Sequence, residues 1–73
     1  MLSIERHEQI LQILMEKKSV TVGELSKTMF VSDATIRRDL SQMEKEGLIV
    51  LSENDGRRKT YLLTNAGMEA LRA

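Results

Sequence analysis

The feature that most constrains the fold is a break of two residues, Phe30 and Val31, between two segments that each have helical apolar spacing. The segment before the break predicts a helix that continues through Met29. After the break, Ser32 is placed to cap a helix from Asp33 to about Glu46. Two helices joined by so short a turn cross one another, and the first supports the second. The chain is therefore expected to fold around a crossed pair of helices.

Both helices of this pair have a clear inward face. Thr21 and Glu24, three residues apart, fit a capping box that opens the earlier helix. In both helices the apolar residues repeat every three or four positions, so they gather on one side. The residues predicted to face the core are Val22, Leu25 and Met29 in the earlier helix and Ile36, Leu40 and Met43 in the later one.

One more helix is predicted before this pair. Its apolar residues keep the same spacing from Ile4 to Lys17, and Ser3 is available as its N-cap. The stretch 19–21 that follows is β-prone and is expected to form a short strand. At the far end of the pair, Gly47 is placed to end the helix in a left-handed conformation. The pattern of the chain changes after this glycine.

A β-hairpin and a short helix are predicted to follow. The runs 48–51 and 61–63 are β-prone, and Asn54-Asp55-Gly56 between them is a strong turn signal because these residue types tolerate positive φ. Either Thr64 or Asn65 then caps the last helix. The hairpin lies where it can form a wing beside the crossed pair.

Length and composition agree with one small domain over residues 1–73. A chain of this length holds a single core. It is 41% hydrophobic and 30% charged, a balance typical of neither a membrane span nor a disordered segment. The predicted fold class is mainly α with a small β-hairpin. It is a winged helix-turn-helix with three core helices, a wing of two or three strands and a short C-terminal helix.

Composition also argues against several classes of function. The chain has no cysteine, and His7 is its single histidine, so neither a disulfide framework nor a Cys/His metal site is available. No nucleophile stands beside a base, and Asp33, Asp39 and Glu46 lack the spacing of a metal motif. We therefore expect no catalytic residue, metal, cofactor or enzymatic activity. The longest apolar stretch, 47–51, is far too short to span a bilayer, and a signal peptide pattern is missing, so a cytoplasmic location is expected.

The charge pattern of the helix 33–46 points to DNA, although the formal net charge of the chain is zero. At about 100° per residue, its outward half carries three cations, and its acids are expected on or near the inward half. Cationic and short polar side chains suit phosphates and base edges in a major groove. An ordinary solvated face is the alternative interpretation. The outward residues are Ala34, Thr35, Arg37, Arg38, Ser41, Gln42 and Lys45, and the acids are Asp33, Asp39, Glu44 and Glu46.

The hairpin supplies a second cationic group. Arg57, Arg58 and Lys59 are consecutive and follow the turn directly. Near a flexible tip all three can reach a phosphate, which is the use expected of a wing. Charges that keep an edge strand from pairing with another chain are the alternative interpretation. A cationic helix nearby favours the wing.

Residues of the first and third predicted helices carry a more specific pattern. They are Arg6, Ile10 and Leu14 at four-residue spacing, followed by Ser32, Thr35, Ile36, Arg37, Arg38, Asp39 and Leu40. Over roughly Ile4 to Leu51 the chain resembles the helix-turn-helix region of the DeoR family of bacterial transcription regulators. The resemblance implies a winged-helix fold, with Ile36 and Leu40 in the core. It also implies that Ser32, Thr35, Arg37 and Arg38 lie at the DNA surface.

The same resemblance implies a supporting role for Asp39. By its position, this carboxylate pairs either with a neighbouring cation or with backbone donors. Two departures from the family are visible. The Gly-Gly-Ala segment common in its wing is missing, and the large sugar-phosphate-sensing domain does not follow within these residues. The passage from Tyr61 to Gly67 instead resembles the end of MarR- or PadR-like winged helices, so we expect no small-molecule effector site.

Taken together, the sequence predicts a sequence-specific DNA-binding transcription regulator that contacts double-stranded DNA. The helix 33–46 would lie in the major groove, with the wing 52–60 on the backbone or in the minor groove. An adaptor that binds an acidic protein partner is the alternative. The predicted DNA-binding residues are Thr21, Ser32, Ala34, Thr35, Arg37, Arg38, Ser41, Gln42, Lys45, Arg57, Arg58 and Lys59.

Several apolar residues exceed what the predicted core requires. One interpretation is a homodimer formed through the first or last helix, since operators usually present two half-sites. The other is that these residues simply fill the core. The residues concerned are Leu2, Leu11, Met15, Met68 and Leu71.

Overall fold

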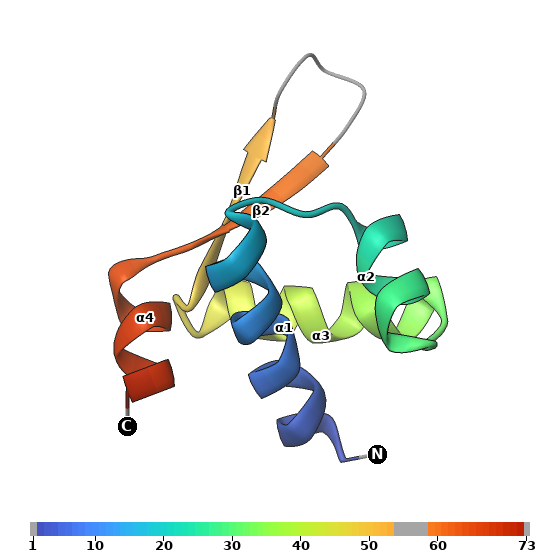
Figure 1. Ribbon diagram of the computed structural model, residues 1–73, viewed down its shortest axis with the longest axis horizontal. Helices are drawn as coiled ribbons and strands as arrows, with labels where there is room; N and C mark the ends of the chain where they lie inside the picture. Colours follow the sequence, from blue (N-terminus) through green and yellow to red (C-terminus); the bar gives the residue numbers. More distant parts are fainter. Residues whose placement is uncertain (1, 54–58, 73) are drawn as a thin grey trace.

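The computed structural model describes residues 2–53 and 59–72, and it has the predicted order of elements (Figure 1). The hairpin projects from one side of a body of helices, and α2 and α4 lie toward opposite ends of α3. This is the predicted winged helix-turn-helix. The elements are α1 (Ser3–Lys17), α2 (Val22–Met29), α3 (Asp33–Lys45), β1 (Ile49–Glu53), β2 (Lys59–Leu63) and α4 (Asn65–Arg72).

The core lies where α1, α2 and α3 meet the hairpin. Ile36, Leu40 and Met43 of α3 are fully buried, as predicted from their spacing. In α2, Leu25 and Met29 are buried and Val22 packs against the core at its edge. The remaining buried apolar residues are Ile10, Leu11 and Leu14 of α1, Val20 of the following loop and Ile49 of β1.

Leu11 is therefore not available for self-association. Its side chain is 4% exposed, because it lies on the inward face of α1 between Ile10 and Leu14. Leu2 and Met15 were predicted with Leu11 as possible self-association residues, and they are 69% and 48% exposed. Leu2 and Met15 are thus exposed apolar residues outside the core, as the sequence indicated, whereas Leu11 is part of the core.

Side-chain caps define the starts of the crossed pair as predicted. At α2, Glu24 N donates to Thr21 Oγ1 at 3.2 Å, and Thr21 N donates to Glu24 Oε1 at 2.9 Å. This reciprocal pair is a capping box, which satisfies amide groups that have no partner inside the helix. At α3, Thr35 N donates to Ser32 Oγ at 3.3 Å. Gly47 then has a φ of 79°, in the left-handed region predicted for it.

Two local predictions at the N-terminal side are wrong. Ser3 is the first residue of α1 rather than its cap, because Leu2 has the extended backbone and its amide donates to Glu5 Oε1 at 2.9 Å. The stretch 19–21 does not form a strand. Only Val20 pairs, through an isolated bridge to Tyr61 in which Tyr61 N donates to the Val20 carbonyl at 3.0 Å. This single bond joins the loop before α2 to the wing.

The hairpin pairs its two strands in antiparallel register, with Ile49 opposite Leu63 and Leu51 opposite Tyr61. These two pairs face the helical core because alternate residues of a strand point to one side. The predicted turn at Asn54-Asp55-Gly56 lies outside the described residues.

The start of α4 is held tightly against the end of α3. Thr64 is its cap, since Gly67 N donates to Thr64 Oγ1 at 3.1 Å. The same hydroxyl donates to the Gly47 carbonyl at 2.6 Å, and Thr64 N donates to the Leu48 carbonyl at 3.1 Å. A Cβ at Gly67 would lie well inside van der Waals contact with that Leu48 oxygen. A residue without a side chain is therefore required at this close approach.

Phe30 occupies an unusual position at the turn between α2 and α3. It caps α2 in the left-handed region, with φ 56° and ψ 45°, where glycine or asparagine is usual. Its side chain is 93% exposed, so the ring gains little from packing. Both the backbone and the side chain of this residue are thus unfavourable for stability.

Replacing Phe30 with glycine is expected to raise the free energy of unfolding by about 1 kcal/mol, because a residue with a Cβ is strained in the left-handed region. Urea unfolding followed by circular dichroism measures this change. Phe30→Ala is the matched control, since it removes the exposed ring and keeps the Cβ. If the alanine variant gained as much stability as the glycine variant, the backbone explanation would be wrong.

Candidate nucleic-acid interface

The exposed side of α3 is the candidate interface. Its fully buried residues Ile36, Leu40 and Met43 fix which side of the helix faces the core. Directly opposite, at spacings of four, three and four residues, lies a row of four exposed positions. We call this row the cationic stripe: Ala34, Arg38, Ser41 and Lys45. It carries two positive charges, a small apolar group and a hydroxyl, which suits a groove lined by phosphates and base edges.

The other predicted residues of α3 lie beside the stripe. Arg37 is exposed on one flank, next to the wing, and Gln42 is exposed on the other flank, next to α1. Gln42 Nε2 donates to Glu46 Oε2 at 3.1 Å. Thr35 is half-buried, and its hydroxyl accepts a hydrogen bond from Ser32 Oγ at 3.0 Å. The structure thus brings all seven outward residues of the predicted helix to the surface or its edge.

The four acids of α3 lie on or near its inward half, as the helical projection predicted, but they differ in burial. Only Asp39 is buried, with 3% of its surface exposed. Asp33, Glu44 and Glu46 are exposed. They project beside the stripe rather than onto it, because about 100° per residue places them nearer the boundary of the buried face. The cationic stripe is therefore flanked by carboxylates on both sides.

Asp39 joins α3 to α1 through an ion pair. Arg6 Nε donates to Asp39 Oδ2 at 2.5 Å, and Arg6 Nη2 donates to Asp39 Oδ1 at 3.1 Å. The ring of His7 adds a third contact, with Nε2 at 3.3 Å from Asp39 Oδ1. The sequence left open whether a cation or backbone donors would satisfy this carboxylate. Two side chains of α1 do so.

The ion pair changes the acidity of both partners. Burial on its own raises the pKa of the Asp39 carboxyl, but the hydrogen bonds from Arg6 and His7 outweigh it and hold that pKa below its ordinary value. The hydrogen bond to Asp39 in turn raises the pKa of Arg6. Asp39 is therefore ionised at neutral pH, and a bidentate contact of this kind restricts rotation of α3 about its own axis. The cationic stripe is held outward by the same contact.

The remaining predicted residues lie on α2 and the wing. Thr21 is half-buried at the start of α2, and its hydroxyl donates to Glu24 Oε1 at 3.2 Å. Lys59 is exposed at the start of β2, opposite Glu53 in the strand register. Arg57 and Arg58 lie outside the described residues.

Tyr61 was missed by the sequence analysis, although it lies between the wing and α3. It is half-buried and packs against the core. Burial raises the pKa of its hydroxyl, Glu44 raises it further, and Arg37 lowers it. Tyr61 therefore lies near the charged residues on the wing-side flank of α3. Its place two residues before Leu63, on the inward side of the strand, was the available signal.

Other kinds of site are not indicated within residues 2–53 and 59–72. No group of three or more His, Cys, Asp or Glu side chains is arranged to hold a metal ion there. Among the helices of this part of the chain, none is both long and apolar enough to cross a membrane.

Comparison with solved structures agrees with this architecture. A MarR-family transcriptional regulator from Silicibacter pomeroyi matches 92% of this chain and 46% of its own, with a TM-score of 0.82 and 27% sequence identity. ZitR of Lactococcus lactis, solved in complex with DNA, matches 92% of this chain and 47% of its own, with a TM-score of 0.84 and 25% identity. The winged helix-turn-helix fold and its MarR-like end are thus confirmed.

Comparison of sequences gives the family. The uncharacterised HTH-type transcriptional regulator YgbI of Escherichia coli K12 is 45% identical over 51 residues, which cover 70% of this chain and 20% of that protein. A putative aga operon transcriptional repressor of Escherichia coli O157:H7 is 50% identical over 46 residues, or 63% of this chain and 17% of that protein. The chain thus spans about a fifth of the length of these relatives. Residues 6–52 match the DeoR-like helix-turn-helix domain, and the chain belongs to this family.

Proposed function

We propose that the chain is the DNA-binding domain of a transcription regulator and binds double-stranded DNA through α3. The observation that carries the proposal is the cationic stripe, which lies directly opposite the buried face of α3. In this proposal Arg38, Ser41 and Lys45 enter the major groove, and Arg37 and Gln42 contact its edges. Thr21, Ser32, Ala34 and Thr35 complete the contacts on the helix pair, and the wing residues 57–59 contact the backbone.

The family supports this function. Relatives of the chain carry the names of transcription regulators and repressors, and ZitR, which has the same fold, was solved with DNA bound. We infer from the same family names that the chain acts in the cytoplasm and is not an enzyme.

Self-association belongs to the proposal as well. Met15 is 48% exposed beside an apolar groove of about 350 Å³ between α1, β2 and α4, which is also lined by Leu62 and Met68. A homodimer that covered this groove would present two copies of α3 to two half-sites. The number of chains bound to each duplex, measured by sedimentation, reports on it directly.

Replacing Arg37 and Arg38 together with alanine is expected to weaken binding to a random-sequence duplex about 100-fold, since each charge-assisted contact with a phosphate contributes about 1.5 kcal/mol. Two lost phosphate contacts would also reduce the slope of log affinity against log salt by about 1.8. Fluorescence anisotropy at several salt concentrations measures both quantities.

The matched control removes two positive charges elsewhere. Lys17 and Arg72 are exposed at the C-terminal ends of α1 and α4, and replacing both with alanine changes the net charge equally. Binding should change little in that variant. An equal loss in both variants would exclude α3 as the binding element. Polyglutamate serves as a competitor, and binding to it as tight as to DNA would favour the adaptor for an acidic protein.

A further inference from the structure

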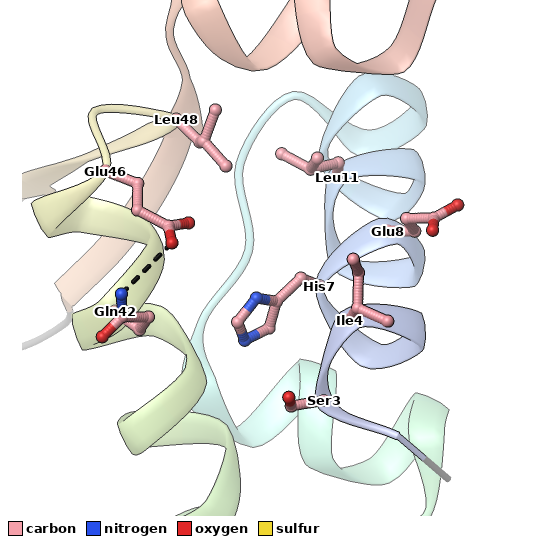
Figure 2. A pocket seen from close by; sticks show the side chains of 8 residues that line it. All are labelled: Ser3, Ile4, His7, Glu8, Leu11, Gln42, Glu46 and Leu48. Carbon is pink, nitrogen blue, oxygen red and sulfur yellow. Dashed lines mark hydrogen bonds between the residues drawn. The ribbon is translucent and has the colours of Figure 1, made fainter. Parts of the chain in front are cut away.

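A seam runs between α1 and α3, on the side of α3 away from the wing. It contains two adjoining hollows that share Ser3, His7 and Gln42 in their walls. Figure 2 shows the larger hollow, with the ring of His7 reaching from α1 toward α3. The two hollows have volumes of about 400 and 300 Å³. The larger hollow is mainly apolar, whereas the smaller one is lined by charged and polar residues.

The smaller hollow, which we call the α1–α3 cleft, is lined by cationic and neutral polar groups. Besides the three shared residues, its walls contain Arg6, Arg38 and Asp39. The one carboxylate among them is paired with Arg6 and contacts His7, so its charge is compensated. Arg38 contributes a further positive charge and also belongs to the cationic stripe. The cleft is therefore a positively charged extension of the proposed DNA surface onto α1.

The larger hollow has the opposite character. Ile4, Leu11 and Leu48 make its walls mainly apolar, and its acidic residues are Glu8 and Glu46. In Figure 2 the Glu8 carboxylate points away from α3, while Glu46 lies close to the seam and accepts the hydrogen bond from Gln42. An anion would be repelled at this end. The seam thus has one end suited to a phosphate and one end unsuited to it.

We propose that the α1–α3 cleft receives a backbone phosphate of the DNA strand that borders the major groove on the side opposite the wing. The inference rests on the proposed function, because the cleft is an extension of the surface of α3. It adds α1 to the interface. Arg38 provides the charge, and the hydroxyl of Ser3 provides a hydrogen-bond donor at the mouth of the cleft. Among the described residues, the Ser3 side chain has no hydrogen-bond partner.

The position of Ser3 on α1 makes the donor available. Ser3 lies four residues before His7 and seven before Ile10, so it continues the inward face of the helix beyond the end of the core. It is exposed because this end of α1 extends beyond the buried residues of the helix, the first of which is Ile10. A side chain at this position points into the seam, where a phosphate of a duplex bound to α3 would pass.

The test uses charge substitutions at Ser3 in the whole chain, with a random-sequence duplex as the probe. Ser3→Lys should steepen the slope of log affinity against log salt by about 0.9, because one more phosphate is neutralised. Ser3→Asp should weaken binding about fivefold, from repulsion between two charges about 4 Å apart in water. An acid in the first turn of a helix is favourable for the helix, so the aspartate variant is expected to fold.

Gln12 is the matched control position. It is exposed on α1, half a turn from the direction of Ser3, and Gln12→Lys and Gln12→Asp repeat the same charge changes away from the seam. Larger effects at Ser3 than at Gln12 support the inference. Equal effects at both positions, with binding by the wild type intact, contradict the inference alone. If the wild type does not bind duplex DNA, both this inference and the proposed function are wrong.

Discussion

Replacing Asp39 with alanine is expected to lower the free energy of unfolding by about 2 kcal/mol, between the costs of breaking an exposed and a fully buried ion pair. The carboxylate is 3% exposed and Arg6 17% exposed, so the guanidinium would lose a partner that is itself buried. For a domain of this size the midpoint of thermal unfolding should fall by roughly 8–16 °C. Thermal and urea unfolding followed by circular dichroism measure the change.

Two further variants separate the ion pair from a general effect of removing an acid. Glu44→Ala removes an exposed carboxylate from the same helix and should change the free energy of unfolding by less than about 0.5 kcal/mol. Arg6→Met combined with Asp39→Leu should recover most of the loss, because apolar residues of similar size replace buried ion pairs well. If Asp39→Ala were as stable as Glu44→Ala, the ion pair would contribute nothing to the fold.

The pH dependence of stability tests the Arg6–Asp39 ion pair independently. The pKa of Asp39 is lower in the folded chain than its ordinary value of 3.8. The unfolded chain therefore binds a proton more readily, and the stabilisation is present above about pH 4 and is lost as the pH falls through the folded pKa. In Asp39→Asn this part of the acid loss should disappear, so its stability should decrease less than that of the wild type between pH 5 and pH 2.

Replacing Gly67 with alanine is expected to cost about 3 kcal/mol, at the upper end for overpacking a buried position. The added Cβ would lie 2.6 Å from Leu63 Cδ2 and closer still to the Leu48 carbonyl oxygen. A side chain can move away, but this carbonyl is held by its hydrogen bond from Thr64 N. The start of α4 would have to shift. Urea unfolding measures the loss.

Gly23→Ala is the matched control. Gly23 also lies in the first turn of an eight-residue helix, but a Cβ there would meet no atom closer than 4.0 Å. Alanine should stabilise α2 by up to about 1 kcal/mol, because glycine is unfavourable inside a helix. The two variants are thus expected to change stability in opposite directions. A loss at both positions would show that glycine is needed for helix starts in general and not for close approach at Gly67.

The features that the sequence predicted well are those decided by neighbours in the chain. Thr21, Ser32 and Gly47 mark helix ends because a cap is made with residues only a few positions away. The buried face of α3 was equally predictable, since its apolar spacing and its burial follow the same period. The candidate site was found from this face, because the cationic stripe lies opposite to it.

The features that were missed depend on residues far apart in the chain or on the reach of a side chain. Arg6 and Asp39 are 33 residues apart, and nothing in either helix shows that the two will meet. The close approach at Gly67 likewise depends on how α4 packs against Leu48 and against Leu63 of β2. A helical projection placed Glu44 and Glu46 near the inward half but gave no burial, because a long charged side chain at such a boundary extends into water.

The bridge between Val20 and Tyr61 affects how this surface can diversify. It is made by backbone atoms, so it ties the wing to the loop before α2 whatever side chains occupy these positions. The position of the wing relative to that loop is then insensitive to substitutions along the outer side of the hairpin. Under the proposed function, mutations there are expected to change the DNA contacts of the wing without moving it away from that loop. The proposed DNA-sequence specificity of such a domain can therefore change while its backbone stays the same.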